Sequence, residues 1–235
     1  MSEQGANKTV ADDGTVSFKK DRLEIGLRPM TDVELNRRFS SYEEAYGGGS
    51  PNPYTFGGST VFRTGETPQR FTVFLASLSN YQYPKVYLDP SRVYITTSNG
   101  RKYYALNFEQ LSTYYRRYIR GGTGGNDPGV SGNAHYLLKE REGILKATMF
   151  VDEVVFSAQE LEGYLVFEPI APDVNELTVH IPDVVVRYDY KGDPIENLDV
   201  EIHFEREIGR IYPDGSKIPT LNNKRVAHDP TPGAD

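Results

Sequence analysis

The segment between residues 154 and 204 restricts the fold most, because its strand patterns follow one another with no helical pattern between them. In residues 198–204, apolar side chains alternate with charged or polar ones, as in a strand with one face in water. Parallel strands need long connections that are usually helical, so this segment predicts antiparallel pairing. The expected strands are residues 155–157, 163–167, 176–181, 184–190 and 198–204.

The preceding part of the chain mixes strand and helix patterns. Strands are expected at residues 15–29 and 69–80, and a hairpin within 85–107 is closed by Asn99 and Gly100, which favour a tight turn. Helices are expected at residues 32–46, 107–119 and 134–148, the first with a capping box formed by Thr31 and Glu34. Short strands in two groups, joined by helical segments, predict a mainly β protein with two antiparallel sheets packed face to face.

Composition excludes several classes of site. The chain has no Cys, so no disulfide, thiol nucleophile or zinc–thiolate site can form. No apolar run is long enough to cross a bilayer, and the first 20 residues lack a signal-peptide pattern. A net charge of -7 argues against a partner made of duplex nucleic acid. We predict no catalytic residue, cofactor or metal.

Charge is distributed unevenly along the chain. Residues 81–120 hold seven basic and two acidic side chains together with nine Tyr, whereas residues 151–207 hold fifteen acidic and three basic ones. Because Tyr and Arg are favoured at protein interfaces, the basic segment predicts a partner-binding surface. The alternative is that most of these Tyr lie in the core or on a sheet face. The candidate residues are Tyr103, Tyr104, Tyr114, Tyr115, Arg116, Arg117 and Tyr118.

Two groups of mainly acidic side chains have the composition of a catalytic or metal-binding site. Glu160 and Glu162 have the pairing that glycoside hydrolysis needs, but the preferred interpretation is a solvent-facing strand entry, where Gly163 permits a bulge or a close backbone approach. The second set shares one strand face at spacings too wide for one metal ion, which favours a solvated sheet face. That set is Asp199, Glu201, His203 and Glu205.

The remaining motifs are weak. Residues 120–133 are rich in Gly but lack the Lys-Ser/Thr ending of a nucleotide-binding loop, which favours an ordinary loop. Ser131 does not have the glycine spacing of a nucleophile elbow. The four His, at positions 135, 180, 203 and 228, have no metal-binding spacing.

The order of the parts resembles a known family. The stretches "FTVFLASLSNYQYPKVYLDPSRVYITTSNGRKYYALNFEQL" and "VVFSAQELEGYLVFEPIAPDVNELTVHIP" are similar to bacterial cell-envelope lipoproteins and related Ig-like domains of largely uncharacterised function. The resemblance covers about residues 71–204 and implies an Ig-like β-sandwich with a helical insertion. With the helix expected at 32–46, the predicted fold is an Ig-like antiparallel β-sandwich with helical insertions and an N-terminal helix. Its motifs carry no catalytic residue.

The patterns along the chain predict a domain plan, and the resemblance implies a location. We expect an N-terminal arm with a strand and a helix at 1–50, the sandwich at 51–207 with a helical insertion at about 107–150, and a polar tail at 208–235. Such lipoproteins begin with a signal peptide and a lipid-bearing Cys, which this chain lacks. The expectation is a mature form in the periplasm or at the cell surface, with the cytoplasm as the alternative.

Together these features predict a non-catalytic domain of the bacterial cell envelope that acts by protein interaction or as a structural part of a larger assembly. The partner is a protein or a second copy of the chain. Membrane contact is expected only through a lipid anchor. A carbohydrate-binding module is the alternative, and a glycoside hydrolase using Glu160 or Glu162 is a distant one.

Overall fold

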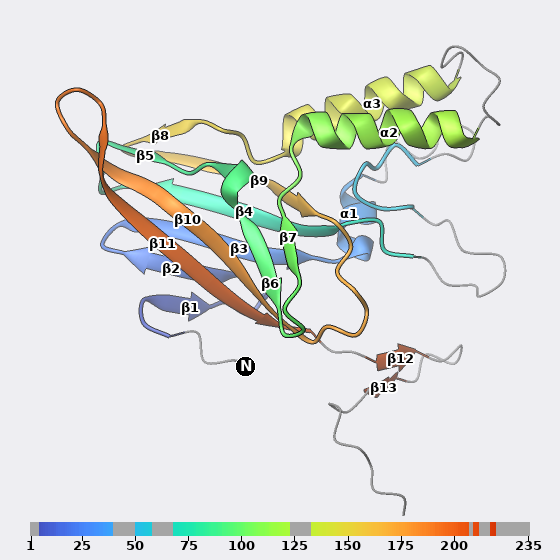
Figure 1. The fold of residues 1–235 in the computed structure, drawn as a ribbon, viewed down its shortest axis with the longest axis horizontal. Coiled ribbons are helices and arrows are strands. Elements are labelled where there is room, and N and C mark those ends of the chain that lie inside the picture. The colour runs from blue at the N-terminus through green and yellow to red at the C-terminus, as the bar shows by residue number, and fades with distance from the viewer. Residues whose placement is uncertain are drawn as a thin grey trace, which may run out of the picture.

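The computed structural model describes residues 5–39, 50–57, 68–122, 133–206, 209–211 and 217–219. It confirms a mainly β chain with two antiparallel sheets, to which helices are added (Figure 1). The first sheet has five strands in the order β1-β2-β3-β4-β9. These strands are β1 (Lys8–Val10), β2 (Val16–Lys20), β3 (Leu23–Met30), β4 (Thr72–Asn80) and β9 (Gln159–Phe167).

The second sheet has six strands, ordered β7-β6-β10-β5-β8, with β11 also paired to β10. β10 is the central element, since it pairs with β11, β6 and β5. A separate hairpin joins β12 (Gly209–Ile211) to β13 (Lys217–Pro219). The strands of the second sheet are β5 (Lys85–Tyr87), β6 (Tyr94–Thr97), β7 (Lys102–Tyr104), β8 (Val154–Phe156), β10 (Glu176–Tyr188) and β11 (Pro194–Glu205).

Three α-helices lie among the described residues: α1 (Asp32–Arg38), α2 (Phe108–Gly122) and α3 (Asn133–Thr148). The predicted capping box of α1 is present, with the Glu34 amide donating to the Thr31 hydroxyl at 3.2 Å. At α2 the Gln110 amide donates to the Asn107 side chain at 2.9 Å, as expected of an N-cap. The two longer helices run side by side (Figure 1). Residues 40–46 of the expected first helix lie outside the described residues.

The N-terminal strands belong to the sheet, in contrast to the arm expected before residue 50. β3 pairs with β4 along its whole length, from Leu23 opposite Asn80 to Met30 opposite Val73. The expected strand at 15–29 is two strands joined by a turn in which Asp21 has a φ of 55°. The sheet therefore continues across the expected domain boundary. Of the expected C-terminal tail, the structure describes only β12 and β13.

The first sheet buries both of its faces only at the end where the helices lie (Figure 1). Along β9, Leu165 and Phe167 point into a core between the two sheets, whereas Tyr164 and Val166 point into a second core against the helices. This is the alternation that the sequence predicts for a strand buried on both faces. We call these the inter-sheet core and the helical core. At this end the fold has three layers: the second sheet, the first sheet and the helices.

Gly163 confirms the expected close backbone approach. A Cβ atom at this position would lie 2.4 Å from the backbone nitrogen of Phe150. The Phe150 amide donates to the Tyr164 carbonyl at 3.0 Å, so the chain leaving α3 is held directly against β9. Gly163 therefore allows the helical segment to join the sheet.

The strands of the second sheet depart from the sequence prediction in their lengths. β10 runs through the two expected strands, with an irregularity between Ile181 and Val184 where Asp183 has a φ of 53°. This local bulge explains the interrupted apolar pattern in the sequence. The expected hairpin between β6 and β7 is confirmed, and Gly100 takes the positive φ of 80° that its turn requires.

Candidate binding surface on the second sheet

The structure divides the predicted Tyr- and Arg-rich surface between two elements. Tyr103 and Tyr104 lie in β7, whereas Tyr114, Tyr115 and their neighbours lie in α2. Tyr115 is 0% exposed and belongs to the helical core. Because α2 packs this side chain against the segment before β4, Tyr115 is a core residue and not part of a surface.

Tyr115 sits among buried polar groups. Its hydroxyl donates to the Pro53 carbonyl and accepts a hydrogen bond from Arg70 at 3.3 Å. The guanidinium of Arg141 lies 4.9 Å from the centre of its ring. Burial raises the pKa of Tyr115 to about 12. The ring thus links α2, α3 and the segment at 50–57.

The other α2 candidates have mixed surroundings. Tyr114 is half-buried and meets Phe71 edge-on at 5.2 Å. Arg116 forms an ion pair with Glu142 at 3.0 Å, which joins α2 to α3. Arg117 is exposed, and the side chain of Tyr118 lies outside the description.

The two Tyr of β7 point to opposite faces of the sheet. Tyr103 is half-buried and packs against the inter-sheet core. Tyr104 is 57% exposed and opposes Tyr94 of β6, with the ring centres 5.9 Å apart. Of the seven sequence candidates, Tyr104 is therefore the aromatic side chain with the most open position on a described sheet face.

Tyr104 is the first member of a row that crosses four strands. It opposes Tyr94, Tyr94 opposes His180 of β10, and His180 opposes Glu201 of β11. The rings of Tyr94 and His180 stack with centres 4.6 Å apart and an angle of 12° between them. Nδ1 of His180 lies 3.2 Å from a carboxylate oxygen of Glu201. We call these four residues the aromatic row.

A second row runs beside the first, two residues away along each strand. The register places Lys102, Thr96, Thr178 and His203 opposite one another on β7, β6, β10 and β11. The Thr178 hydroxyl and Nδ1 of His203 are 2.8 Å apart, and the Thr96 hydroxyl is 2.8 Å from Nε2 of His180. The second contact connects the two rows, so the face is ordered by hydrogen bonds between side chains.

The ring of Tyr94 is covered on the sheet surface. His180 stacks on it, and the ammonium of Lys102 lies over it at 3.5 Å from the ring centre. Lys102 also lies 4.8 Å from the ring centre of Tyr104. The aromatic row therefore presents ring edges and charged groups, with Tyr104 as its most exposed ring.

The same sheet combines the basic and acidic segments of the chain. The basic segment supplies β5, β6 and β7, and the acidic segment supplies β8, β10 and β11. Since β10 pairs with both β5 and β6, the two segments are adjacent in space, and Arg92 forms an ion pair with Asp183 between them. The charge difference along the sequence therefore does not divide this part of the molecule into a basic and an acidic half.

Glu160 and Glu162 lie where the preferred interpretation placed them. Both are exposed on β9, beside Ser79 and Ser77 of β4. Glu160 accepts a hydrogen bond from the Tyr81 hydroxyl at 2.8 Å. Glu162 lies 3.9 Å from the guanidinium of Arg38. Both are paired surface side chains at a strand entry.

The polar residues of β11 likewise lie on a solvated sheet face. Glu201 pairs with His180, and Asp199 accepts a hydrogen bond from the Asp183 amide at 2.9 Å. Within the described ranges, no three His, Asp or Glu side chains are grouped as metal ligands. His135 is exposed on α3, and His228 lies outside the described residues together with Ser131 and most of the Gly-rich segment.

The seven candidate residues did not include His180, nor Tyr94, which lies within the predicted segment 81–120. Tyr94 alternates with the buried Ile95, which indicates that Tyr94 points outward. Its partner His180 is 86 positions away, however, and a single sequence does not show the register between distant strands.

Comparisons with protein families, with curated proteins and with solved structures found no match for this chain. Among the helices of the described residues, none is both long and apolar enough to span a membrane.

Proposed function

We propose that this protein is a non-catalytic binding domain that holds a protein partner against one face of its second sheet. This outer face carries the aromatic row and points away from the inter-sheet core. The observation that carries the proposal is the aromatic row, in which Tyr104, Tyr94 and His180 align across three strands and end at Glu201. Aromatic side chains supply large contact areas at a low cost in conformational entropy. The hydrogen bonds of the neighbouring row hold this surface in one arrangement before a partner arrives.

The covered ring of Tyr94 favours protein over carbohydrate as the bound molecule. A sugar-binding platform needs free aromatic faces, but His180 and Lys102 both lie over this ring. Tyr104 alone then supplies an open ring in the row, with 57% of its surface exposed. A protein partner can use ring edges, hydroxyl groups and charges together, as the row presents them.

The charge of the surface indicates the chemistry of the partner. Glu201 has 56% of its side chain exposed, and Asp199 and Glu205 are exposed on the same strand face. These carboxylates favour a partner that places Lys or Arg over β11 and an apolar group over Tyr104. Self-assembly through oppositely charged halves has less support, because both kinds of strand lie in this one sheet.

The proposal includes an Ig-like relationship and a location in the bacterial cell envelope. Two antiparallel sheets around one core support the relationship, and the sequence resemblance over about residues 71–204 supports both parts. Fractionation of the native cells tests the location. Recovery in the envelope fraction is expected, and recovery only in the cytosolic fraction would contradict it.

Quantitative co-purification from the native organism tests the binding surface. Immobilised wild-type protein is compared with Tyr104→Ala and Glu201→Lys, and with Tyr190→Ala as the control at another exposed Tyr, in the turn between β10 and β11. The amount of a specific partner that co-purifies should fall by tenfold or more with the first two variants and stay unchanged with the control. If all four proteins retained the partner equally, the proposal that the outer face binds it would be contradicted.

The carbohydrate alternative has a distinct result. If the face binds sugar, purified cell-wall polysaccharide should retain the wild-type protein and release Tyr104→Ala, while no protein is co-purified in proportion to Tyr104. We expect no such retention, because the ring of Tyr94 is covered.

A further inference from the structure

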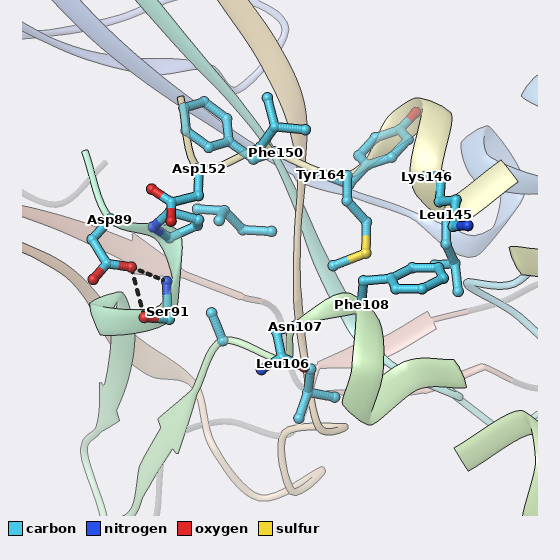
Figure 2. A pocket seen from close by; sticks show the side chains of 15 residues that line it. Asp89, Ser91, Leu106, Asn107, Phe108, Leu145, Lys146, Phe150, Asp152 and Tyr164 are labelled. Atoms are coloured by element: carbon cyan, nitrogen blue, oxygen red, sulfur yellow. Dashed lines mark hydrogen bonds between the residues drawn. The ribbon is translucent and has the colours of Figure 1, made fainter. Parts of the chain in front are cut away.

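A separate cavity of about 480 Å³ lies where the two long helices meet the sheets (Figure 2). Its walls come from the link between β7 and α2, the end of α3, the link to β8, and β9. Its volume is within the range of sites that hold small organic ligands. It shares no residue with the aromatic row or the neighbouring polar row.

The body of the cavity is apolar. Leu145 and Leu165 are buried behind it, whereas Leu106, Phe108 and Met149 are half-buried at its surface. Contact between these half-buried side chains and an apolar ligand is energetically favourable, because it removes more of their apolar surface from water.

The walls are held by main-chain hydrogen bonds, which makes the cavity a formed site. The Leu106 amide donates to the Val166 carbonyl at 2.7 Å, and the Phe150 amide donates to the Tyr164 carbonyl at 3.0 Å. Both bonds tie a connecting segment to β9. A ligand therefore meets walls that need little ordering on binding.

One end of the cavity is acidic. Asp89 and Asp152 lie at this end, and Lys146 lies at the other, near Phe108 (Figure 2). One Asp89 oxygen accepts hydrogen bonds from the amide and hydroxyl of Ser91, at 2.9 and 2.6 Å. Within the part of the chain that the structure describes, neither aspartate takes part in an ion pair within 4.0 Å.

Tyr87 lies near both carboxylates. Hydrogen bonding to Asp152, then burial, then the negative charges of Asp152 and Asp89 raise the pKa of Tyr87 to about 12. The acidic end thus combines two carboxylates with a neutral donor, and it favours a positive group on the ligand.

We propose that this cavity binds a small amphiphilic cation, with an ammonium group between Asp89 and Asp152 and an apolar body against Leu106, Phe108 and Met149. The apolar body fills the half-buried surface, and the ammonium group neutralises the two carboxylates. An anion of the same shape meets the same walls but is repelled at the acidic end.

Methyl NMR of the methionines tests the proposal. The chain has three Met, of which Met149 lines the cavity and Met30 lies in the helical core, where its signal reports the integrity of the fold. The full chain is titrated with octylammonium, octanoate and octanol, which share one alkyl chain and differ in charge. We expect octylammonium to shift the Met149 signal and to bind at least tenfold more tightly than octanoate.

The double variant Asp89→Asn, Asp152→Asn separates charge from shape. Its affinity for octylammonium should fall by tenfold or more while its affinity for octanol stays unchanged, and the Met30 signal should stay at its wild-type position. A Met149 signal that no probe moves would overturn the proposal. So would equal affinity for octylammonium and octanoate, or an unchanged octylammonium affinity in the folded double variant.

Discussion

Two groups of tyrosines in this protein have opposite surroundings. Tyr54, Tyr115 and Tyr164 are no more than 1% exposed in the helical core, where the ring centres of Tyr54 and Tyr164 are 4.9 Å apart. Tyr94 and Tyr104 lie on the outer face of the second sheet. The same residue type therefore serves folding in one region and is available for contact in the other.

The two groups also differ in the surroundings of their hydroxyl groups and rings. In the helical core, Tyr54 and Tyr115 have protein hydrogen-bond partners, and burial raises the pKa of each. On the outer face, the Tyr104 ring is exposed to solvent and contacts the Tyr94 ring on the neighbouring strand. Removing a buried ring should therefore affect stability, whereas removing Tyr104 should affect binding.

The largest expected effect on stability is at Tyr115. Tyr115→Ala leaves a cavity between α2 and α3 and removes a hydrogen-bond partner of Arg70. We expect the free energy of unfolding to fall by about 3–5 kcal/mol, measured by urea denaturation. Tyr115→Phe is the control, with a smaller loss. A loss below about 1 kcal/mol for Tyr115→Ala would show that this ring does not support the helical core.

The next effect is a pH dependence of the helical core. Burial opposes ionisation of Glu142, but hydrogen bonds from Ser112, Arg116 and Lys139 outweigh it and lower its pKa from 4.5 to about 2. A depressed pKa stabilises the folded state above pH 4.5, and this contribution is lost as the pH falls toward about 2. We expect a loss of about 2–3 kcal/mol over this window.

Glu142→Gln provides the comparison for this pH dependence. The variant should be less stable than the wild type at neutral pH, and the difference should shrink as the pH falls toward about 2. Urea denaturation at several pH values measures both proteins. Parallel stability curves for the two proteins between pH 5 and 2 would contradict the assignment of this window to Glu142.

A smaller effect is expected at Tyr54. Its hydroxyl lies 2.5 Å from that of Thr148, which itself donates to the Ile144 carbonyl at 2.7 Å, so Tyr54 is the donor. Tyr54→Phe keeps the ring and removes this bond, which should cost about 1 kcal/mol of unfolding free energy. The double variant with Thr148→Val measures the coupling. If Tyr54→Phe left the free energy of unfolding unchanged, the hydrogen bond would contribute nothing to stability, and packing alone would stabilise the ring.

The smallest effect on stability is expected at Tyr104. Tyr104→Ala removes a cross-strand ring contact at the sheet surface, so the free energy of unfolding should change by less than about 1 kcal/mol. Thermal unfolding measures this change beside the loss of the partner. A destabilisation as large as that of Tyr115→Ala would contradict the distinction between the buried tyrosines and those on the outer face.

The sequence predicted the strands better than the surfaces. Alternation along Leu165, Val166 and Phe167 indicated a strand buried on both faces, and Asn99 with Gly100 indicated the hairpin. The location of Tyr115 depends instead on how α2 docks onto the first sheet, and the row from Tyr104 to Glu201 depends on the register between distant strands. Both are tertiary properties that local patterns do not contain.

Site-specific photo-crosslinking tests the proposed binding surface most directly. A photoreactive phenylalanine analogue replaces Tyr104 in one protein and Tyr136, which is 65% exposed on α3, in the control. In native cells, position 104 should give one discrete crosslinked protein, and excess wild-type protein should compete with it while Tyr104→Ala does not. Crosslinking from position 136 alone, or equally from both positions, would contradict the account.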